Sequence, residues 1–476
     1  MTTSLPRHSV LRSATVILAA HLLASLAAPA ETTPARVFNV RAHGARGDGH
    51  TLDTKAIQHA IDACHQAGGG EVRLPVGTFL SGTIRLKSRV TLHLAPGSRL
   101  VGTTNLAEYD HPTPPAYLPE ARWGKWHRGL LIAQGAEDVT ITGPGTIDGN
   151  RVFDPAGEER MRGPHTLVFV DCRRFRVEDV TFVDSANYAI FFQVSDDVEI
   201  RGARFIGGWD GVHWRGAPER WCHNVRIIGC EFRTGDDSIA GRYWNNTLIS
   251  GCLINSSCNG IRLIGPATHL IIHDSLFHGP GQQPHRTSGE RRRTNMLAAI
   301  NLQPGAWDPT QGPLDDVLIS DVTIHNASTP FHFVTKPGNT AGRITVSGAT
   351  VTGSYLAAAS VESWAESPFT NVVFRDVTLE FNGGGKPDPK APDVKGPGVD
   401  ARPLPAWGLY ARGIQNLTLE NVRLATRSDD LRPALIARDL GRLRLDEFRF
   451  ASPPAADTPF PPGGSTPAAS RTSPSR

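Results

Sequence analysis

The sequence predicts an all-β protein built as a parallel β-helix, a solenoid in which each turn of the chain adds short strands to the same sheets. Three observations support this fold class. The 476 residues exceed the roughly 250–300 that one compact core usually holds, an alternating apolar pattern recurs along most of the chain, and helical periodicity is confined to one segment. A composition with 20% charged residues, 48 Gly and 36 Pro argues against a disordered polyelectrolyte and against a helical bundle.

Residues 1–30 have the pattern of an export signal. Arg7 and Arg12 precede an apolar run from Ala14 to Ala28, and small residues at Ala28-Pro29-Ala30 suit a cleavage site. That run is too short for a membrane span, and no later stretch approaches about 18 uninterrupted apolar residues. We therefore expect a secreted or periplasmic protein with a signal peptide over residues 1–30 and without an integral membrane span.

Residues 54–67 form the one strongly amphipathic helix that the sequence predicts. Asp53 or Thr54 begins the helix, and Gly68-Gly69-Gly70 ends it. A stack of β coils leaves an apolar surface open at its end, so we expect this helix to cap the N-terminal end of the solenoid. Its apolar side is made of Ala56, Ile57, Ala60, Ile61, Ala63 and Cys64.

A repeat of apolar or small residues at positions i, i+2, i+5 and i+7 organises the rest of the chain. Alternation at spacing two indicates a strand with one buried face, and the three-residue step indicates a bend. Successive anchors are 22 to 28 residues apart, except for gaps of 47 and 45 residues that are each near two periods. The ten anchors are Phe175, Val198, Val225, Thr247, Leu270, Val317, Ile344, Val372, Leu417 and Leu443.

The repeat also sets the boundaries of the predicted domain, a β-helix over residues 31–451. Segments 280–295 and 383–405 interrupt the period and are predicted to be long loops, and the Pro- and Ser-rich residues 452–476 are predicted to be a disordered tail. The six cysteines show no C-x-x-C spacing, which excludes a zinc ribbon and favours buried thiols, with one bridge left open. Stacked coils would place Cys230 on Cys252.

Three middle coils carry the residues that suggest chemistry. They contain Asp210-Gly211, then Asp236-Asp237, then Asn259, at intervals of about one coil. Residues one coil apart lie about 4.8 Å apart, so we expect the three aspartates to meet on one outer face. Close carboxyl groups raise the pKa of at least one member, and a protonated acid beside a carboxylate suits glycosidic hydrolysis. A Ca²⁺ site and a simple Asp-Asp turn are the alternatives.

These segments resemble family 28 glycoside hydrolases, the polygalacturonase-like pectinases of the right-handed, pectin-lyase-like β-helix type. The stretch from Phe38 to Gly82 resembles the cap and first coil of that family, "GWDGV" its Asn-Thr-Asp-Gly-Ile segment, and "TGDDSIAG" its Gly-Asp-Asp segment. The resemblance implies an inverting, cell-wall pectin-degrading hydrolase that needs no metal or other cofactor. It implies Asp236 as general acid, with Asp210 and Asp237 activating water between carboxyl groups roughly 6.5–9.5 Å apart.

The sequence also departs from that family at its substrate-binding positions. The Gly-His-Gly histidine falls at Asn259, and the Arg-Ile-Lys cations fall at Asn301 and Gln303, which are neutral amides. Arg242 and Arg262 either hold a uronate carboxylate in their place or pair with neighbouring aspartates, so the charge of the substrate stays open. The residues that we expect to bind substrate are His213, Arg242, Asn259, Arg262, Asn301 and Gln303.

Aromatic residues near the acids suggest where sugars could stack. We expect one or two members of this cluster to line sugar subsites, while the others pack under loops. The cluster is formed by Trp209, Trp214, Trp221, Tyr243 and Trp244.

The expected partner is a polysaccharide or oligosaccharide, bound by a monomer. The 49 basic and 46 acidic side chains nearly balance, which argues against nucleic acid as a partner. Two other functions are compatible with the sequence. One is a β-helix polysaccharide lyase, which needs Ca²⁺ or another neutralising group and an Arg or Lys base. The other is a non-catalytic secreted glycan-binding β-helix.

Overall fold

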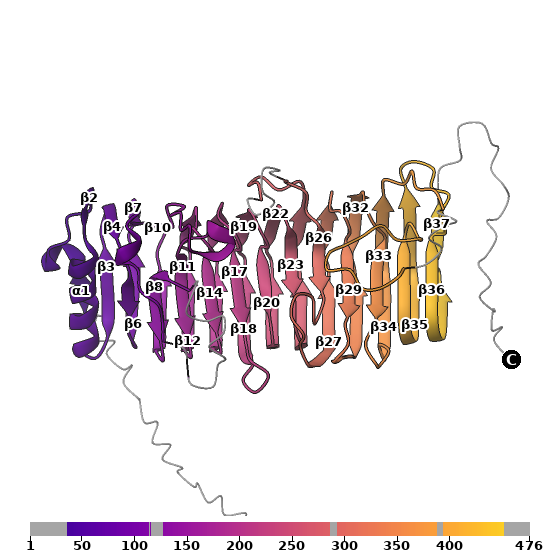
Figure 1. The fold of residues 1–476 in the computed structure, drawn as a ribbon, viewed down its shortest axis with the longest axis horizontal. Coiled ribbons are helices and arrows are strands. Elements are labelled where there is room, and N and C mark those ends of the chain that lie inside the picture. The colour runs from indigo at the N-terminus through magenta and orange to yellow at the C-terminus, as the bar shows by residue number, and fades with distance from the viewer. Residues whose placement is uncertain (1–35, 114, 116–126, 286–292, 388–393, 452–476) are drawn as a thin grey trace, which may run out of the picture. The chain divides into compact units, whose positions relative to one another are not determined.

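The structure, a computed structural model, describes residues 36–113, 115, 127–285, 293–387 and 394–451. The predicted signal peptide (1–30) and the predicted tail (452–476) lie outside the described residues. Parallel pairing joins strands β1 to β37 into the continuous sheet of a parallel β-helix, as the repeat predicts (Figure 1). Most coils contribute one strand to each of three faces, which we name A, B and C. Within the described part of the chain, no helix has the length and apolar character needed to cross a membrane.

Face A contains the repeat anchors. Its strands are β1 (Val37–Asn39), β3 (Gly70–Leu74), β6 (Val90–Leu94), β9 (Glu137–Thr142), β12 (Arg173–Glu178), β15 (Asp196–Arg201), β18 (Cys222–Ile228), β21 (Trp244–Ser250), β24 (Ala267–His273), β27 (Gly312–Ser320), β30 (Asn339–Ala341) and β31 (Arg343–Ser347).

Face B follows face A along each coil. Its strands are β2 (Asp48–Leu52), β4 (Gly77–Ser81), β7 (Ser98–Gly102), β10 (Thr146–Asp148), β13 (Thr181–Val183), β16 (Arg204–Ile206), β19 (Glu231–Thr234), β22 (Leu253–Ser256), β25 (Leu276–His278), β28 (Thr323–His325), β32 (Thr350–Ser354) and β37 (Arg449–Ala451).

Face C carries the candidate site. Its strands are β5 (Ile84–Leu86), β8 (Gly129–Gln134), β11 (His165–Val170), β14 (Ile190–Gln193), β17 (Val212–Arg215), β20 (Ile239–Arg242), β23 (Asn259–Leu263), β26 (Ala298–Leu302), β29 (Phe331–Thr335) and β33 (Ala359–Ser363). Three longer strands pass from one face to another, namely β34 (Asn371–Phe381), β35 (Leu409–Thr426) and β36 (Leu435–Asp446). Short 3-10 turns are η1 (Val40–His43), η2 (Leu106–Glu108) and η4 (Glu158–Arg160).

The ten predicted anchors pair with one another in sequence order, from Phe175 on β12 to Leu443 on β36, which confirms the repeat. The interpretation of the two long gaps as nearly two periods is wrong. Leu270 pairs directly with Val317, and Val372 pairs directly with Leu417. Each gap is therefore one coil with a long insertion, because register follows hydrogen-bonded neighbours and not sequence distance.

The N-terminal helix α1 (Thr54–Gln66) confirms the predicted cap. Its residues Ile57, Ala60 and Ile61 are fully buried, and the helix lies at the N-terminal end of the stacked coils (Figure 1). Asp53 precedes the helix without capping it through its side chain. Its carboxylate instead accepts hydrogen bonds from the backbone N–H groups of residues 46 and 47, at 2.7 and 2.9 Å, and so fixes the preceding turn.

The interior consists of ladders of like residues, because parallel coils stack equivalent positions on one another. Cys230 and Cys252 stack as expected, and all six cysteines are buried and unbridged. Trp214 on β17 and Trp244, the first residue of β21, stack in the interior with their ring centroids 4.0 Å apart.

One long connection, between β34 and β35, folds over the outer side of face C. Residues Val394–Leu404 of this connection are called the strap here. The Nε2 of Gln303 donates to the carbonyl oxygen of Gly398, and Arg402 pairs with the buried Glu362 at 2.7 Å. Leu404 packs against an apolar cluster that includes Tyr410. These contacts attach the strap to the end of β26, to β33 and to β35.

Candidate active site

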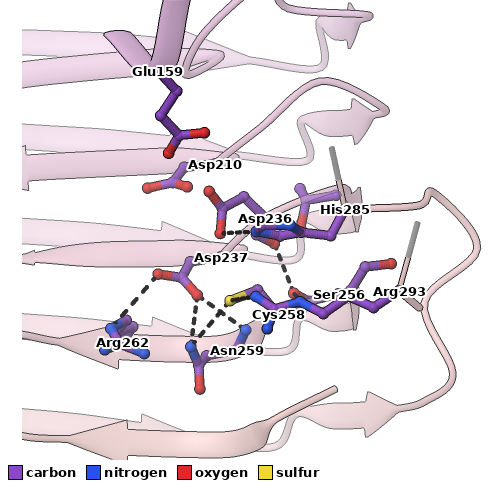
Figure 2. A network of polar contacts seen from close by, with 12 residues as sticks. Glu159, Asp210, Asp236, Asp237, Ser256, Cys258, Asn259, Arg262, His285 and Arg293 are labelled. Atoms are coloured by element: carbon purple, nitrogen blue, oxygen red, sulfur yellow. Dashed lines mark hydrogen bonds and ion pairs between the residues drawn. The ribbon is translucent and has the colours of Figure 1, made fainter. Parts of the chain in front are cut away.

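Asp210, Asp236 and Asp237 meet in front of face C, and we call these three residues the carboxyl trio. They lie in the turns just before β17 and β20, where the coils stay in register: Gly211 N–H donates to the carbonyl oxygen of Asp237 at 3.0 Å. A Cβ atom at Gly211 would stand 2.6 Å from the Ser238 carbonyl oxygen, so this tight stacking requires glycine after the aspartate. One oxygen from each carboxyl group lies within 4.8 Å of the other two (Figure 2).

The carboxyl trio is compact. Its closest oxygens lie within 4.8 Å of one another, a distance between single atoms that is shorter than the separation of whole carboxyl groups. The roughly 6.5–9.5 Å of inverting glycosidases refers to whole carboxyl groups, so the 4.8 Å limit neither matches nor contradicts it.

Asp236 is held by two groups from loops outside its own coil. Nη2 of Arg162 lies 3.0 Å from Oδ2 of Asp236, and Nε2 of His285 lies 3.3 Å from Oδ1 (Figure 2 shows His285). Burial alone would raise the pKa of Asp236, but the hydrogen bond from His285 and the charge of Arg162 hold this pKa below its usual value. Asp236 is therefore a carboxylate in the free protein.

Asp210 has a different environment. Nδ1 of His213 lies 2.7 Å from its Oδ2, and Nε of Arg215 donates to Nε2 of His213 at 2.9 Å. Since Arg215 can only donate, Nε2 of His213 is the acceptor, and its Nδ1–H donates to Asp210. Burial, together with the negative charges of Asp236 and Asp237, raises the pKa of Asp210 well above its usual value. Burial and the charge of Arg215 lower the pKa of His213 well below 6.5, which agrees with a neutral ring.

Asp237 is oriented by the next coil. Its Oδ1 accepts hydrogen bonds from the backbone N–H of Asn259 at 3.0 Å and from the Asn259 side chain at 2.8 Å (Figure 2). Burial raises the pKa of Asp237, the charge of Asp236 raises it further, and Arg262, 4.0 Å away, opposes the change. Asn259 thus contacts a member of the carboxyl trio but does not line the open space in front of it.

The carboxyl trio lines a cavity of about 770 Å³. Of the sequence-predicted substrate-binding residues, His213, Arg242 and Arg262 line this cavity, whereas Asn259, Asn301 and Gln303 do not. The predicted loop 280–295 contributes His285 and Arg293 to its wall. The other lining residues are His127, Glu158, Glu159, Arg162, Tyr188, Arg215, Ala240, Cys258, Ile264, Trp307, Asp308 and Asp400.

Asn301 and Gln303 occupy the outward positions that the sequence suggests, yet neither side chain reaches the cavity. Both are fully buried, and Gln303 donates to the strap while Asn301 lies beside Asn259. Arg242 and Arg262 reach the cavity with acidic partners of their own. Arg242 pairs with Asp308 at 2.9 Å, and Arg262 pairs with Asp400 of the strap at 2.7 Å, as the salt-bridge alternative anticipates.

The five aromatic residues expected near sugar subsites lie outside the cavity lining. Trp214 and Trp244 are fully buried in the core, and the Trp209 ring lies beneath Arg162, with the guanidinium carbon 4.1 Å from the ring centroid. Trp307, in the segment after β26, lines the cavity instead and is 63% exposed. The expectation fails because neighbours in the sequence of a β-helix point alternately inward and outward.

Several lining residues were not identified by sequence reasoning. Glu158, Glu159 and Arg162 come from the long connection between β10 and β11, and His285 comes from the connection between β25 and β26. Figure 2 shows Glu159 above Asp210, and burial raises the pKa of Glu159. The interruption of the repeat was the only available signal, since it marks loops that could fold over face C.

In the part of the chain that the structure describes, two groups of side chains approach the geometry of a metal site. The ligand atoms of the carboxyl trio lie within 4.8 Å of one another, as do those of Asp236, Cys258 and His285. The second group fits a cation poorly. Arg162 already lies against Asp236, and burial with the charges of Asp237 and Asp236 raises the pKa of Cys258 well above its usual value, so its thiol stays protonated.

Comparison with known families and structures agrees with this fold. A family profile described as "Right handed beta helix region" matches residues 166–283, and a second, described as "Rhamnogalacturonase A/epimerase, pectate lyase-like", matches residues 37–105. The chain is similar to the crystal structure of a hyperthermoactive exopolygalacturonase from Thermotoga maritima, with a TM-score of 0.58 and 19% identity over 82% of this chain and 92% of the other. That likeness shows a shared right-handed β-helix fold.

Two proteins are similar in sequence. A "Probable polygalacturonase" of Vitis vinifera is 24% identical over 409 residues, which are 79% of this chain and 81% of that protein. An "Exo-poly-alpha-D-galacturonosidase" of Dickeya chrysanthemi is 38% identical over 260 residues. The second alignment spans 44% of this chain and 42% of that protein, so it covers less than half of each.

Proposed function

We propose that this chain, which is similar to polygalacturonases and has a right-handed β-helix fold, is a secreted hydrolase of pectic polysaccharide of the family 28 type. One observation carries the proposal: Asp210, Asp236 and Asp237 meet within 4.8 Å in a cavity of about 770 Å³. Cleavage of a glycosidic bond requires one group that protonates the leaving oxygen and another that activates water. The carboxyl trio can supply both.

We assign Asp236 as the general acid, with Asp210 and Asp237 activating the attacking water. In the free protein the surroundings favour the proton on Asp210, and Arg162 and His285 keep Asp236 ionised. Carboxyl groups this close titrate as one unit. A bound sugar that displaces Arg162 from Asp236 therefore transfers the shared proton toward the leaving oxygen, while Asp210 becomes the base.

The stereochemistry of the reaction is a separate part of the proposal. Inversion follows from the family resemblance, and a retaining reaction is the alternative that two carboxyl groups can also perform. Proton NMR of the first-formed product decides between them. We expect the anomer of opposite configuration to appear first, and early accumulation of the retained anomer would contradict inversion.

The activity is tested by incubating the protein with pectic and neutral polysaccharides and measuring new reducing ends. We expect hydrolysis of at least one pectic substrate, and a loss of about 10²- to 10⁴-fold in kcat for Asp236→Asn, as for other groups that transfer protons. Asp197→Asn is the matched control, because Asp197 belongs to a second Asp-Asp pair and does not line the cavity. If the wild-type protein releases no reducing ends from any glycan, the proposal is wrong.

A non-catalytic glycan-binding β-helix is the second candidate. The ion pair of Asp236 with Arg162 favours it, since a carboxylate held in this way cannot donate a proton in the free protein. Such a protein would bind glycans with equal affinity in the wild-type and Asp236→Asn forms and would cleave none. A lyase would instead generate unsaturated ends, which absorb ultraviolet light, from an acidic polymer.

A further inference from the structure

Arg215 and Arg242 stand side by side on face C, at the ends of β17 and β20. They are directly paired in the parallel register, and both line the cavity. Neighbouring strands are about 4.8 Å apart, so the two guanidinium groups can reach the same ligand. The carboxyl trio lies before the starts of the same two strands. Along the strand the backbones of the two arginines lie about 13 Å from the trio, but the Arg215 side chain reaches back toward it, because its Nε lies 2.9 Å from Nε2 of His213, whose Nδ1 lies 2.7 Å from Asp210.

The charges around this arginine pair do not balance. Asp308 pairs with Arg242 at 2.9 Å, but within the described residues no carboxylate forms an ion pair with Arg215, whose Nε donates to His213. The Nε of Arg242 is buried and has no hydrogen-bond partner. Burial and the charge of Arg215 lower the pKa of Arg242, which reflects two like charges held next to each other. Among the described residues, Asp308 is thus the one carboxylate that forms an ion pair with either arginine.

We propose that Arg215 and Arg242 form an anion subsite, which binds the anionic substituent of a sugar neighbouring the one that is cleaved. The inference rests on the proposed function. A guanidinium pair with one unpaired positive charge and open cavity in front suits a carboxylate or a sulfate ester, and either would offset the repulsion between the arginines. Because Arg215 is linked to Asp210 through His213, the subsite adjoins the carboxyl trio and would hold a substituent of the sugar next to the scissile bond.

This subsite would supply the recognition of an acidic sugar that Asn301 and Gln303 cannot provide, because both amides are buried. It differs from the Arg262 position, where Asp400 and Asp237 already surround the cation. Asp308 limits the affinity of the subsite, since it competes with the ligand for Arg242.

Binding of three monosaccharides by isothermal titration calorimetry tests the proposal. The probes are galacturonate, galactose 6-sulfate and neutral galactose, and the proteins are wild type, Arg242→Gln and Arg215→Gln. We expect the wild-type protein to prefer an anionic probe over galactose by at least tenfold, and each variant to lose most of that preference, since a hydrogen bond to a charged group contributes about 10- to 100-fold. The preferred anionic probe identifies the source as a uronate or a sulfate ester.

Two further variants separate a binding role from a structural one. Asp308→Asn removes the competing acid and should increase the preference for the anionic probe several-fold, a gain that damage to the fold would not produce. Arg226→Gln is the control for loss of positive charge, because Arg226 is exposed on β18 and does not line the cavity. An unchanged preference in both Arg242→Gln and Arg215→Gln, or no preference in the wild-type protein, would overturn the subsite.

The outcomes also distinguish this inference from the proposed function. Arginine-dependent binding of an anionic sugar without cleavage of any glycan would support the subsite and refute the hydrolase. Hydrolysis of neutral glycans without a preference for anionic probes would refute the subsite and leave the hydrolase intact.

Discussion

Two stretches of face C have the same backbone register but different surroundings. On β17, β20 and β23, the outward side chains of His213, Arg242 and Arg262 line the cavity. On β26, β29 and β33, the next rungs along the solenoid, the outward side chains do not line the cavity, and the strap contacts Gln303 and Glu362. The covered residues are Asn301, Gln303, His332, Ser360 and Glu362.

The difference shows that an outward position in a β-helix is only a potential binding position. Polar side chains occur in both stretches, but those under the strap are used to hold it, as in the pairing of Glu362 with Arg402. In the open stretch, similar side chains line the cavity, and Arg262 at its boundary pairs with Asp400 of the strap. The predictions below contrast the open stretch with the covered one.

The largest contrast is expected between Asp237→Asn in the open stretch and Glu362→Gln in the covered one. Asp237→Asn removes a group that activates water, so kcat should fall by about 10²- to 10⁴-fold with little change in Tm. Glu362→Gln leaves Arg402 without its buried partner and should lower the free energy of unfolding by about 1–3 kcal/mol at unchanged kcat. Kinetics and thermal melts of both variants check this, and a Glu362 variant that loses kcat while stable would contradict the contrast.

A smaller effect is expected at His213, which acts through Asp210 as a positioning residue. His213→Leu removes the Nδ1–H bond to Asp210 and should lower kcat about 10- to 100-fold. His213→Asn retains an N–H at a similar place and should recover part of the loss.

The pH profile separates positioning by His213 from simple packing. The hydrogen bond from the Nδ1–H of His213 stabilises the ionised form of Asp210. Its removal in His213→Leu should raise the pKa of Asp210 further, and the acidic limb of the kcat/KM profile should shift to higher pH. An unshifted limb, or no recovery in His213→Asn, would assign His213 a structural role only.

Trp307 should have a modest effect on substrate affinity. Its ring is exposed at the cavity, and the guanidinium carbon of Arg262 lies 5.4 Å from its centroid. Trp307→Ala should raise KM about 2- to 10-fold with little change in kcat, as expected for the loss of one aromatic contact. Trp364, whose indole N–H donates a hydrogen bond to Glu362 in the covered stretch, is the comparison residue. Trp364→Ala should leave KM unchanged. Equal KM values for Trp307→Ala and wild type would remove Trp307 from the substrate site.

The smallest expected effect is on stability. The pKa of Asp210 is higher in the folded protein than in the unfolded chain, so the folded state holds the proton more tightly and its stability falls as pH rises above about 4. Asp210→Asn removes the loss of folding stability that accompanies ionisation of the Asp210 carboxyl group. Its Tm should exceed that of wild type by about 1–2 °C at pH 7, and the difference should disappear near pH 3.5. A difference independent of pH would contradict the raised pKa.

Much of the fold follows from local periodicity. The ten anchors from Phe175 to Leu443 pair as the repeat predicts, because every coil must bury one side of each strand. The meeting of Asp210 with Asp236 and Asp237 also follows, since a separation of one period becomes a contact between adjacent rungs. Contacts made by long insertions do not follow, because no period relates Arg162 or His285 to Asp236.

The sequence by itself therefore determined the parallel β-helix, its N-terminal helical cap, and the assembly of three aspartates on one face. All of these depend on spacing along the chain, which a repeating backbone converts directly into position. The tertiary structure decided which outward residues are open to a ligand, which arginines already have acidic partners, and which aspartate holds a proton. These properties depend on the strap and on the loops that carry Arg162 and His285, whose paths are set by side-chain contacts far apart in the sequence.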